Sequence, residues 1–328
     1  MVTPRLKILV TDPIIGRFAS ILAPPGEHDL VLAAGRPDEE IVAALPGTDV
    51  AVCSRMTEAM ARASGPELRL VHCTGAGYER IAIDALPPGT AVCNTFHHGP
   101  SIAEHVVMVM LMLSRQVLRK DRLVREGVWE SVGVDPGLPL GDTLAGRTLG
   151  LLGLGETGRE VARLTAAFGM RVQAMRRDPG APLDGGLRLD RVLPPGGLHE
   201  LLTSSDVVVV TVPLNEHTRG LIGAAELDRM RRTALLINVA RGPVVDERAL
   251  YEALAAGRIG GAGIDVWWPG EQGAGRGGST MPFEKLDNVV LTPHNSGHTA
   301  RTFESRARDI AANIAALAEG RPLRNVIR

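Results

Sequence analysis

One stretch of this chain, residues 148–178, constrains its fold more than any other. The apolar run TLGLL at 148–152 leads straight into Gly153-x-Gly155-x-x-Gly158, and Val161, Leu164 and Phe168 then recur at helical spacing. In such a strand–turn–helix unit, the first glycine permits a tight turn, the second lets backbone approach a pyrophosphate, and the third lets helix and strand pack closely. Glycine makes up 38 of the 328 residues, so three spaced glycines alone are weak evidence for a binding turn. The flanking strands and helix provide the stronger support. The pattern predicts a dinucleotide-binding βαβ unit with phosphates at the helix N-terminus.

The end of the next strand bears on the choice between the two nicotinamide cofactors. An Asp or Glu at this place hydrogen-bonds the ribose 2′-OH and repels a 2′-phosphate. Here the sequence reads Met175-Arg176-Arg177, and two adjacent guanidiniums suit bidentate contact with a phosphate. We therefore predict NADP(H) over NAD(H). Two solvated arginines, or Asp178 reaching back to the ribose, are the alternatives that the residues leave open.

Composition argues against several classes of partner. The chain is long enough for two domains, with 45% hydrophobic and 22% charged residues. Its 36 basic and 37 acidic residues give a net charge of -1, so we expect neither nucleic acid nor a membrane as partner. No secretory segment precedes the strand-like run KILV at residues 7–10, and we expect a cytoplasmic protein that binds a small molecule.

The three cysteines, Cys53, Cys73 and Cys93, are evenly spaced, and each closes a short apolar run. Their odd number and the lack of a CxxC pair argue against a disulfide framework or a metal site. We expect reduced thiols at strand ends and no metal.

Strand and helix signals alternate along the whole chain, which indicates an α/β protein with two doubly wound parallel sheets. The first series of strands reads KILVT, DLVLA, DVAVCS, LRLVHC and TAVCN, and the second reads TLGLLGLG, RVQAM, SDVVVVTVPL, ALLINVA, GGAGIDV and NVVLT. A helix predicted over 101–115, with Ser101 as N-cap and Glu104 completing a capping box, joins the two series. A last amphipathic helix is predicted over 300–318.

Two polar side chains are candidates for chemistry because each follows a buried strand. Arg241 lies just after the run LLINVA, and His294 follows NVVLTP. Ligands of open α/β sheets bind at the carboxyl ends of the strands. Taken singly, Arg241 also fits a structural anchor and His294 a loop histidine with a satisfied hydrogen bond, but together beside a dinucleotide fold they indicate a catalytic site.

With these motifs, the chain resembles the D-isomer-specific 2-hydroxyacid dehydrogenase family, which includes glyoxylate and hydroxypyruvate reductases. The resemblance spans nearly the whole length and follows the family's order. It is carried by TGAGYERI, SIAEHVVMVMLMLSR, GLGETG, TVPLNEHTRGLI, LLINVARGPVVDERAL, GAGIDV and TPHNSGHT. The resemblance implies a Rossmann cofactor domain, residues 99–296, inserted in a flavodoxin-like substrate domain formed by residues 1–98 and 297–328. It also implies a homodimer built on the cofactor domains.

The resemblance assigns roles residue by residue. Arg241 matches the arginine that holds the substrate carboxylate and polarises the keto oxygen, and His294 matches the acid/base that protonates that oxygen. The turn Gly75-Ala76-Gly77 matches a second carboxylate cradle, and Asp265 matches the acid near the nicotinamide. With those inferred from the residues themselves, the other predicted cofactor-binding positions are Gly153, Leu154, Gly155, Glu156, Thr157, Gly158, Arg176, Arg177, Val212, Pro213, Thr218, Asn238, Val239, Ala240 and Gly297.

One departure from the family concerns the partner of His294. The family places a Glu, or a Gln in formate dehydrogenases, a few residues after the DV dipeptide, and that position is Gly270 here. Glu271 lies one residue later and is our predicted partner, with Gln272 and loss of the acid as alternatives. A Glu would orient the ring and raise its pKa.

The sequence leaves the roles of four further aromatic side chains undecided. Trp267 and Trp268 are candidates for a substrate-pocket wall or for packing at a domain boundary. His97 and His98 either border the same cleft or belong to a solvated turn between the domains.

The function predicted on these grounds is reduction of a small 2-keto acid by NADPH. Two alternatives stay open: an NAD-dependent formate dehydrogenase, which DVWWP and TPHNSGHT also resemble, and a non-catalytic cofactor sensor similar to dehydrogenase-like corepressors.

Overall fold

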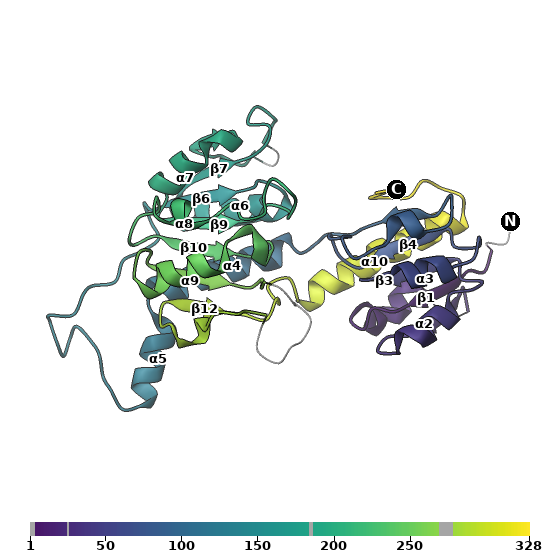
Figure 1. The fold of residues 1–328 in the computed structure, drawn as a ribbon, viewed down its shortest axis with the longest axis horizontal. Coiled ribbons are helices and arrows are strands. Elements are labelled where there is room, and N and C mark those ends of the chain that lie inside the picture. The colour runs from purple at the N-terminus through teal and green to yellow at the C-terminus, as the bar shows by residue number, and fades with distance from the viewer. Residues whose placement is uncertain (1–3, 25, 184–185, 269–277) are drawn as a thin grey trace. The chain divides into compact units, whose positions relative to one another are not determined.

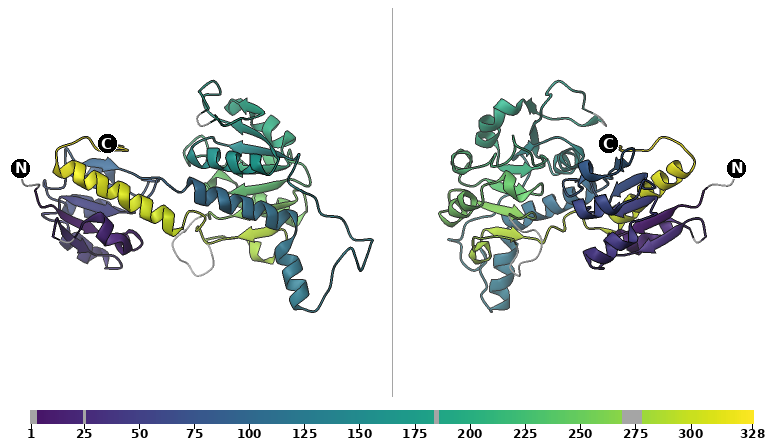
Figure 2. Two further views of the ribbon diagram at one scale, coloured as in Figure 1. Left: turned by 180° about the vertical axis from the view of Figure 1, so that it is seen from behind. Right: turned by 45° about the vertical axis from the view of Figure 1, so that its right-hand side comes forward.

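The computed structural model describes residues 4–24, 26–183, 186–268 and 278–328 (Figure 1). It divides into two compact units, unit 1 with Met1–His97 and His298–Arg328, and unit 2 with His98–Gly297. Each unit holds one parallel sheet with helices on both faces (Figures 1 and 2). The predicted fold class, two parallel-sheet α/β domains, is thereby confirmed.

Unit 1 is built on a five-stranded parallel sheet in the order β2-β1-β3-β4-β5. Its strands are β1 Lys7–Val10, β2 Asp29–Leu32, β3 Val50–Cys53, β4 Leu70–Cys73 and β5 Ala91–Cys93. Its helices are α1 Ala19–Leu22, α2 Asp38–Ala44, α3 Glu58–Ala63 and α10 Ala300–Ala318, with 3-10 turns η1 Ile15–Phe18 and η2 Ile83–Ala85.

Alternating apolar side chains give the sheet of unit 1 two cores. Ile8 and Val10 pack with Phe303 and Ile310 of α10 on one face, whereas Leu9 packs with the apolar residues of α2 and α3 on the other. The period of two along β1 places neighbouring residues on opposite faces. The chain therefore needs its C-terminal helix to cover a sheet made by its N-terminal segment.

Unit 2 is built on a seven-stranded parallel sheet in the order β12-β11-β10-β9-β6-β7-β8. Its strands are β6 Thr148–Leu152, β7 Arg171–Met175, β8 Arg191–Leu193, β9 Val207–Val210, β10 Leu235–Asn238, β11 Gly261–Ile264 and β12 Val289–Leu291. Its helices are α4 Gly99–Ser114, α5 Val117–Arg125, α6 Glu156–Ala167, α7 Leu198–Ser204, α8 Ala224–Leu227 and α9 Glu247–Ala255, with 3-10 turns η4 Pro195–Gly197, η5 Gly242–Val244 and η6 Phe283–Lys285. The order 3-2-1-4-5-6 of a dinucleotide-binding fold runs from β8 to β11, and β12 extends it.

The helices of unit 2 separate onto the two faces of its sheet. One core joins the strands to α4 and α6, and the other joins them to α7, α8 and α9. Four consecutive valines, Val207–Val210, are completely buried, as expected for a central strand covered on both faces.

The structure differs from the sequence prediction at three places in unit 2. The helix α4 begins at Gly99 rather than at Ser101, because Pro100 occupies its first turn, where no N–H bond is required. Ser101 is therefore no N-cap, and its hydroxyl donates to the carbonyl of Ser296 at 2.6 Å. The edge strand β8 was not predicted, and Phe168, predicted beneath α6, ends that helix with 42% of its surface exposed.

Within the described ranges, no single helix has the length and apolarity to cross a membrane. The helices α4 and α5 reach that length and composition only as a pair bent by 59°.

Candidate dinucleotide-binding and catalytic site

The three glycines between β6 and α6 occupy positions with different steric demands. Gly153 has a φ of 102°, which disfavours other residues, and a Cβ on Gly158 would lie 2.5 Å from the carbonyl oxygen of Gly153. Gly155 is the N-cap of α6, and a Cβ there would meet nothing within 4 Å. Gly153 and Gly158 thus close the turn, while Gly155 leaves open space in front of the helix N-terminus. This cradle fits the pyrophosphate of a dinucleotide.

The predicted ribose-binding position, Arg176, follows β7 directly. One terminal nitrogen of Arg176 donates to the carbonyl of Ala181, while its Nε is buried and has no acceptor among the described residues. Arg177 is exposed. The carboxylate of Asp178 accepts from the backbone N–H of Gly180 at 3.0 Å, so it caps its own turn. The half-buried guanidinium of Arg176 is a cation beside the exposed Arg177, and adjacent guanidiniums fit an anionic group better than a ribose hydroxyl.

The turn that carries Arg241 is held by a buried amide. Asn238 ends β10, is 2% exposed, accepts from the N–H of Ala240 at 3.1 Å and donates to the carbonyl of Arg241 at 3.0 Å. Arg241 is half-buried, and one of its terminal nitrogens donates to the carbonyl of Ala240 at 2.8 Å. These bonds fix the backbone on both sides of the guanidinium. Val239 and Ala240 are buried beside it.

The loop that carries His294 is clamped by Asp265. This carboxylate follows β11 and is 1% exposed. Its Oδ1 accepts from the Thr292 hydroxyl at 2.6 Å and from the N–H of Asn295 at 3.0 Å, and its Oδ2 accepts from the N–H of Ser296 at 3.1 Å. His294 lies inside this clamp with a φ of 55°, a conformation that non-glycine residues rarely adopt. We conclude that the loop is held in one conformation from both sides of His294.

The same bonds decide the charge of Asp265. Burial acts to raise the pKa of this carboxyl, but hydrogen bonds from Ser296, Thr292 and Asn295 outweigh it and hold the pKa below its ordinary value. Asp265 is therefore an anion at neutral pH.

The sheet order brings these residues to one edge. Arg241 follows β10, Asp265 follows β11 and His294 follows β12, and these three strands are adjacent. The glycine turn follows β6 at the same carboxyl edge, as do Val212 and Pro213 after β9. Thr218 closes the turn after β9 by donating to the carbonyl of Pro213 at 2.6 Å, and Gly297 ends unit 2.

The two tryptophans belong to the scaffold of this edge. The indole N–H of Trp267 donates to the carbonyl of Thr292 at 2.9 Å, and that of Trp268 donates to the carbonyl of Val245 at 2.7 Å. Trp268 is 5% exposed and stacks on Phe283 with ring centroids 5.6 Å apart. Trp268 therefore packs in the core of unit 2 rather than at a boundary between domains.

The turn predicted to bind a carboxylate lies in unit 1, after β4. The carbonyl of Ala76 accepts from the amide of Asn94 at 2.8 Å, and the carbonyl of Gly75 accepts from the N–H of Thr95 at 3.3 Å. Among the described residues, the backbone N–H groups of Ala76 and Gly77 donate to no acceptor. With its carbonyls occupied and two N–H groups available, the turn fits an anion.

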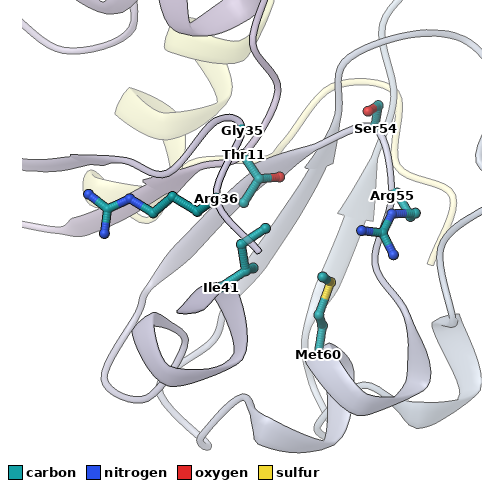
Figure 3. A pocket seen from close by; sticks show the side chains of 7 residues that line it. All are labelled: Thr11, Gly35, Arg36, Ile41, Ser54, Arg55 and Met60. Atoms are coloured by element: carbon teal, nitrogen blue, oxygen red, sulfur yellow. The ribbon is translucent and has the colours of Figure 1, made fainter. Parts of the chain in front are cut away.

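The two adjacent histidines His97 and His98 lie in different units. His97 has a φ of 67°, and its Nε2 lies 2.7 Å from the carboxylate of Asp309 on α10, whereas His98 is the N-cap of α4 in unit 2. A pocket of about 150 Å³ opens where β1, β2 and β3 end, between Thr11, Ser54, Arg55, Ile41 and Met60 (Figure 3). Both terminal nitrogens of Arg55 donate to the carboxylate of Asp38. No residue predicted for the site lines this pocket.

Glu271, the predicted partner of His294, lies outside the described residues, as do Gly270 and Gln272. The roles of Arg241, His294 and the cofactor-binding positions stay predictions.

Comparison with known proteins identifies the family of this chain. Residues 107–296 match the family described as D-isomer specific 2-hydroxyacid dehydrogenase, NAD binding domain. The chain is 34% identical over 330 residues to a glyoxylate reductase of Korarchaeum cryptofilum, covering 96% of this chain and 93% of the relative. The chain belongs to the D-isomer specific 2-hydroxyacid dehydrogenase family. As a member it is an NAD(P)-dependent enzyme of the class that acts on CH–OH donors.

Other relatives match this 2-hydroxyacid dehydrogenase over nearly its full length. A solved 2-hydroxyacid dehydrogenase of Ketogulonicigenium vulgare superposes with a TM-score of 0.81 at 26% identity, covering 100% of this chain and 99% of that structure. A D-3-phosphoglycerate dehydrogenase of Archaeoglobus fulgidus is 32% identical over 326 residues, which is 98% of this chain but only 59% of that relative.

Sequence reasoning missed three supporting residues of this family member: Ser101, Thr292 and Asn94. The side chain of each donates a hydrogen bond to a backbone carbonyl or a carboxylate of a predicted functional segment that lies far away in the sequence. For Thr292, its position two residues before His294 was a usable signal. For Ser101 and Asn94 the sequence held none.

Proposed function

We propose that this enzyme reduces a small 2-keto acid of the glyoxylate or hydroxypyruvate type with NADPH. The observation that supports this most directly is the alignment of Arg241, Asp265 and His294 after three adjacent strands, at the edge that carries the glycine turn. When bound, the nicotinamide supplies a hydride. The remaining tasks are to hold the keto acid, to stabilise charge on its keto oxygen and to protonate that oxygen.

Arg241 and His294 divide these tasks. The guanidinium of Arg241 is charged at every working pH, and its two planar edges suit a carboxylate and an adjacent carbonyl oxygen. His294 donates the proton to the oxygen, since imidazole is the side chain that changes charge near neutral pH. Asp265 keeps the His294 loop in place, and the N–H groups of Ala76 and Gly77 are proposed to bind the substrate carboxylate.

NADP(H) is the proposed cofactor because of Arg176. Its guanidinium at the end of β7, beside the exposed Arg177, supports an anionic group at the ribose, and one oxygen of Asp178 accepts from the N–H of Gly180. NAD(H) is the alternative cofactor.

A homodimer through unit 2 is proposed from its exposed apolar surface. A groove of about 560 Å³ lies between α4 and α6, lined by Glu104, Val107, Met108, Leu111, Met112, Arg115, Val117, Leu164 and Phe168. In Figures 1 and 2, α5 and the segment after it extend away from the sheet, and Trp129 and Leu140 there are 69% and 82% exposed. The exposed apolar side chains on α4, on α5 and in the segment after α5 fit an interface with a second copy of the chain. Light scattering should give twice the mass of one chain, and Met108→Arg should halve it, whereas Leu32→Arg, on an exposed apolar residue of unit 1, should not.

The deciding experiment is a panel of 2-keto acids with NADPH and with NADH, followed by loss of nicotinamide absorbance. Turnover of at least one 2-keto acid, faster with NADPH, is expected. Turnover of formate with NAD would instead favour formate oxidation, and cofactor binding without turnover of any substrate would favour a sensor. A cytoplasmic location is part of the proposal, and a fluorescent fusion of the full chain tests it.

A further inference from the structure

His105 is a half-buried residue on α4. Its Nε2 lies 3.4 Å from the hydroxyl oxygen of Thr292, and Thr292 in turn contacts Asp265. Three residues from three separate segments of unit 2 thus form one line that ends at the clamp around His294.

The direction of each bond in this line follows from the chemistry of the groups. The Asp265 carboxylate is ionised, so it only accepts. The hydroxyl of Thr292 has one hydrogen, and the 2.6 Å contact with Asp265 Oδ1 uses it. Thr292 is therefore left only with a lone pair for His105, and His105 Nε2 must carry a hydrogen and donate. Burial lowers the pKa of His105 although the charge of Asp265 opposes this, so the ring is neutral at neutral pH with its hydrogen on Nε2.

We propose that His105 is a positioning residue of the His294 loop: its Nε2–H fixes the Thr292 hydroxyl so that the hydroxyl proton points at Asp265. Asp265 then has three donors, and two of them are the backbone N–H groups of Asn295 and Ser296 that follow His294. Without His105, the Thr292 hydroxyl has a second rotamer open to it, and Asp265 loses a donor for part of the time.

The kinetics of four variants test the hydrogen-bonded line from His105 through Thr292 to Asp265. These kinetic tests rest on the proposed function. His105→Leu should lower kcat between about threefold and tenfold, the value of one neutral hydrogen bond, with KM for the keto acid within twofold. His105→Gln should restore most of kcat, because its amide N–H lies the same number of bonds from the backbone. Thr292→Val should cost more, about tenfold to a hundredfold, since it removes a bond to a charged group. Thr203→Val, which removes a hydroxyl bond to the carbonyl of His199 on α7, should change nothing.

The double variant His105→Leu/Thr292→Val decides whether His105 acts through Thr292. If it does, the double variant has the kcat of Thr292→Val alone. If the two losses multiply, or if His105→Gln is as slow as His105→Leu, the proposal is overturned.

Hydrogen exchange of the peptide covering residues 292–297 separates this inference from the proposed function, because it needs no turnover. Exchange of this peptide should be faster in His105→Leu and Thr292→Val than in wild type and unchanged in Thr203→Val. Equal exchange in His105→Leu and wild type overturns the positioning role whatever the enzyme reduces. Faster exchange in a protein that reduces no 2-keto acid supports the positioning role and rejects the reductase.

Discussion

The carboxylate of Asp265 accepts a hydrogen bond from the backbone N–H of Ser296 at 3.1 Å, thirty-one positions further along the chain. This bond and its partner to Asn295 tie the end of β11 to the loop after β12. An ionised, 1% exposed carboxylate thus serves as the anchor of the segment that carries the predicted acid/base residue.

Asp265→Asn should therefore damage both the fold and the activity. The amide offers a single acceptor oxygen, whereas the carboxylate accepts three bonds with its two. We expect kcat/KM to fall at least tenfold, since hydrogen bonds to a charged group are worth about 1.5–3 kcal/mol each. The melting temperature should fall as well. Steady-state kinetics and a thermal melt check this, and Asp246→Asn, at the N-cap of α9, is the matched control for a carboxylate that accepts from backbone.

Removal of the proposed acid/base should separate binding from turnover. His294→Ala should lower kcat by two to four orders of magnitude, the usual contribution of general acid catalysis. Cofactor affinity, measured by nicotinamide fluorescence, should change little. Retention of more than about a tenth of kcat would contradict the assigned role.

Two glycine substitutions in the turn after β6 should have opposite profiles. Gly158→Ala places a Cβ 2.5 Å from the carbonyl oxygen of Gly153, so both the melting temperature and cofactor affinity should fall. Gly155→Ala meets nothing within 4 Å and has ordinary backbone angles, so the melting temperature should be unchanged. Its methyl group projects where the pyrophosphate is expected, and cofactor affinity alone should fall. Equal affinity in Gly155→Ala and wild type would argue against a dinucleotide in this turn.

Local patterns of the sequence predicted those parts of the structure that local forces determine. The run from β6 through α6 to β7 was predicted with its glycine turn, because apolar periodicity and glycine sterics act over a few residues. The helix α10 was predicted with the bounds it has, since Phe303, Ile310 and Ile314 mark its buried face.

Predictions failed where the competing force was not visible in the local pattern. Ser101 matched a capping box, but Pro100 fixed an earlier start and the serine hydroxyl was taken by Ser296. The edge strand β8 has three residues, too few for a periodic signal. The contacts of Asp265 with Thr292 and Ser296 join segments brought together only by strand pairing, and no residue spacing predicts them.

A charge reversal at Arg176 should change the cofactor preference. The proposal places the 2′-phosphate at its guanidinium, so Arg176→Asp should lower kcat/KM with NADPH and raise the relative efficiency with NADH. We expect the NADPH/NADH ratio to fall at least tenfold, the value of about 1.4 kcal/mol of lost interaction. Arg188→Asp, an exposed position in unit 2, should leave the ratio unchanged. A wild-type enzyme that prefers NADH would contradict the cofactor assignment outright.

His72 is a fully buried histidine of β4. Its Nδ1 lies 3.0 Å from the carbonyl of Cys73, which makes Nδ1 the donor, and its Nε2 accepts from the amide of Asn313 at 3.0 Å. Both bonds need the neutral ring. Burial lowers the pKa of His72 from 6.5 to about 4, because the charged form loses its hydration.

A folded pKa below the unfolded one means that the unfolded chain binds the extra proton first as the pH falls. The stabilisation by neutral His72 is therefore complete above pH 6.5 and is lost between pH 6.5 and 4, at up to about 1.4 kcal/mol per pH unit. The melting temperature of wild type should fall over this range more steeply than that of His72→Gln, which keeps an acceptor and a donor but has no titratable group. Parallel falls in the two proteins would show that His72 is not the group whose protonation weakens unit 1 in acid.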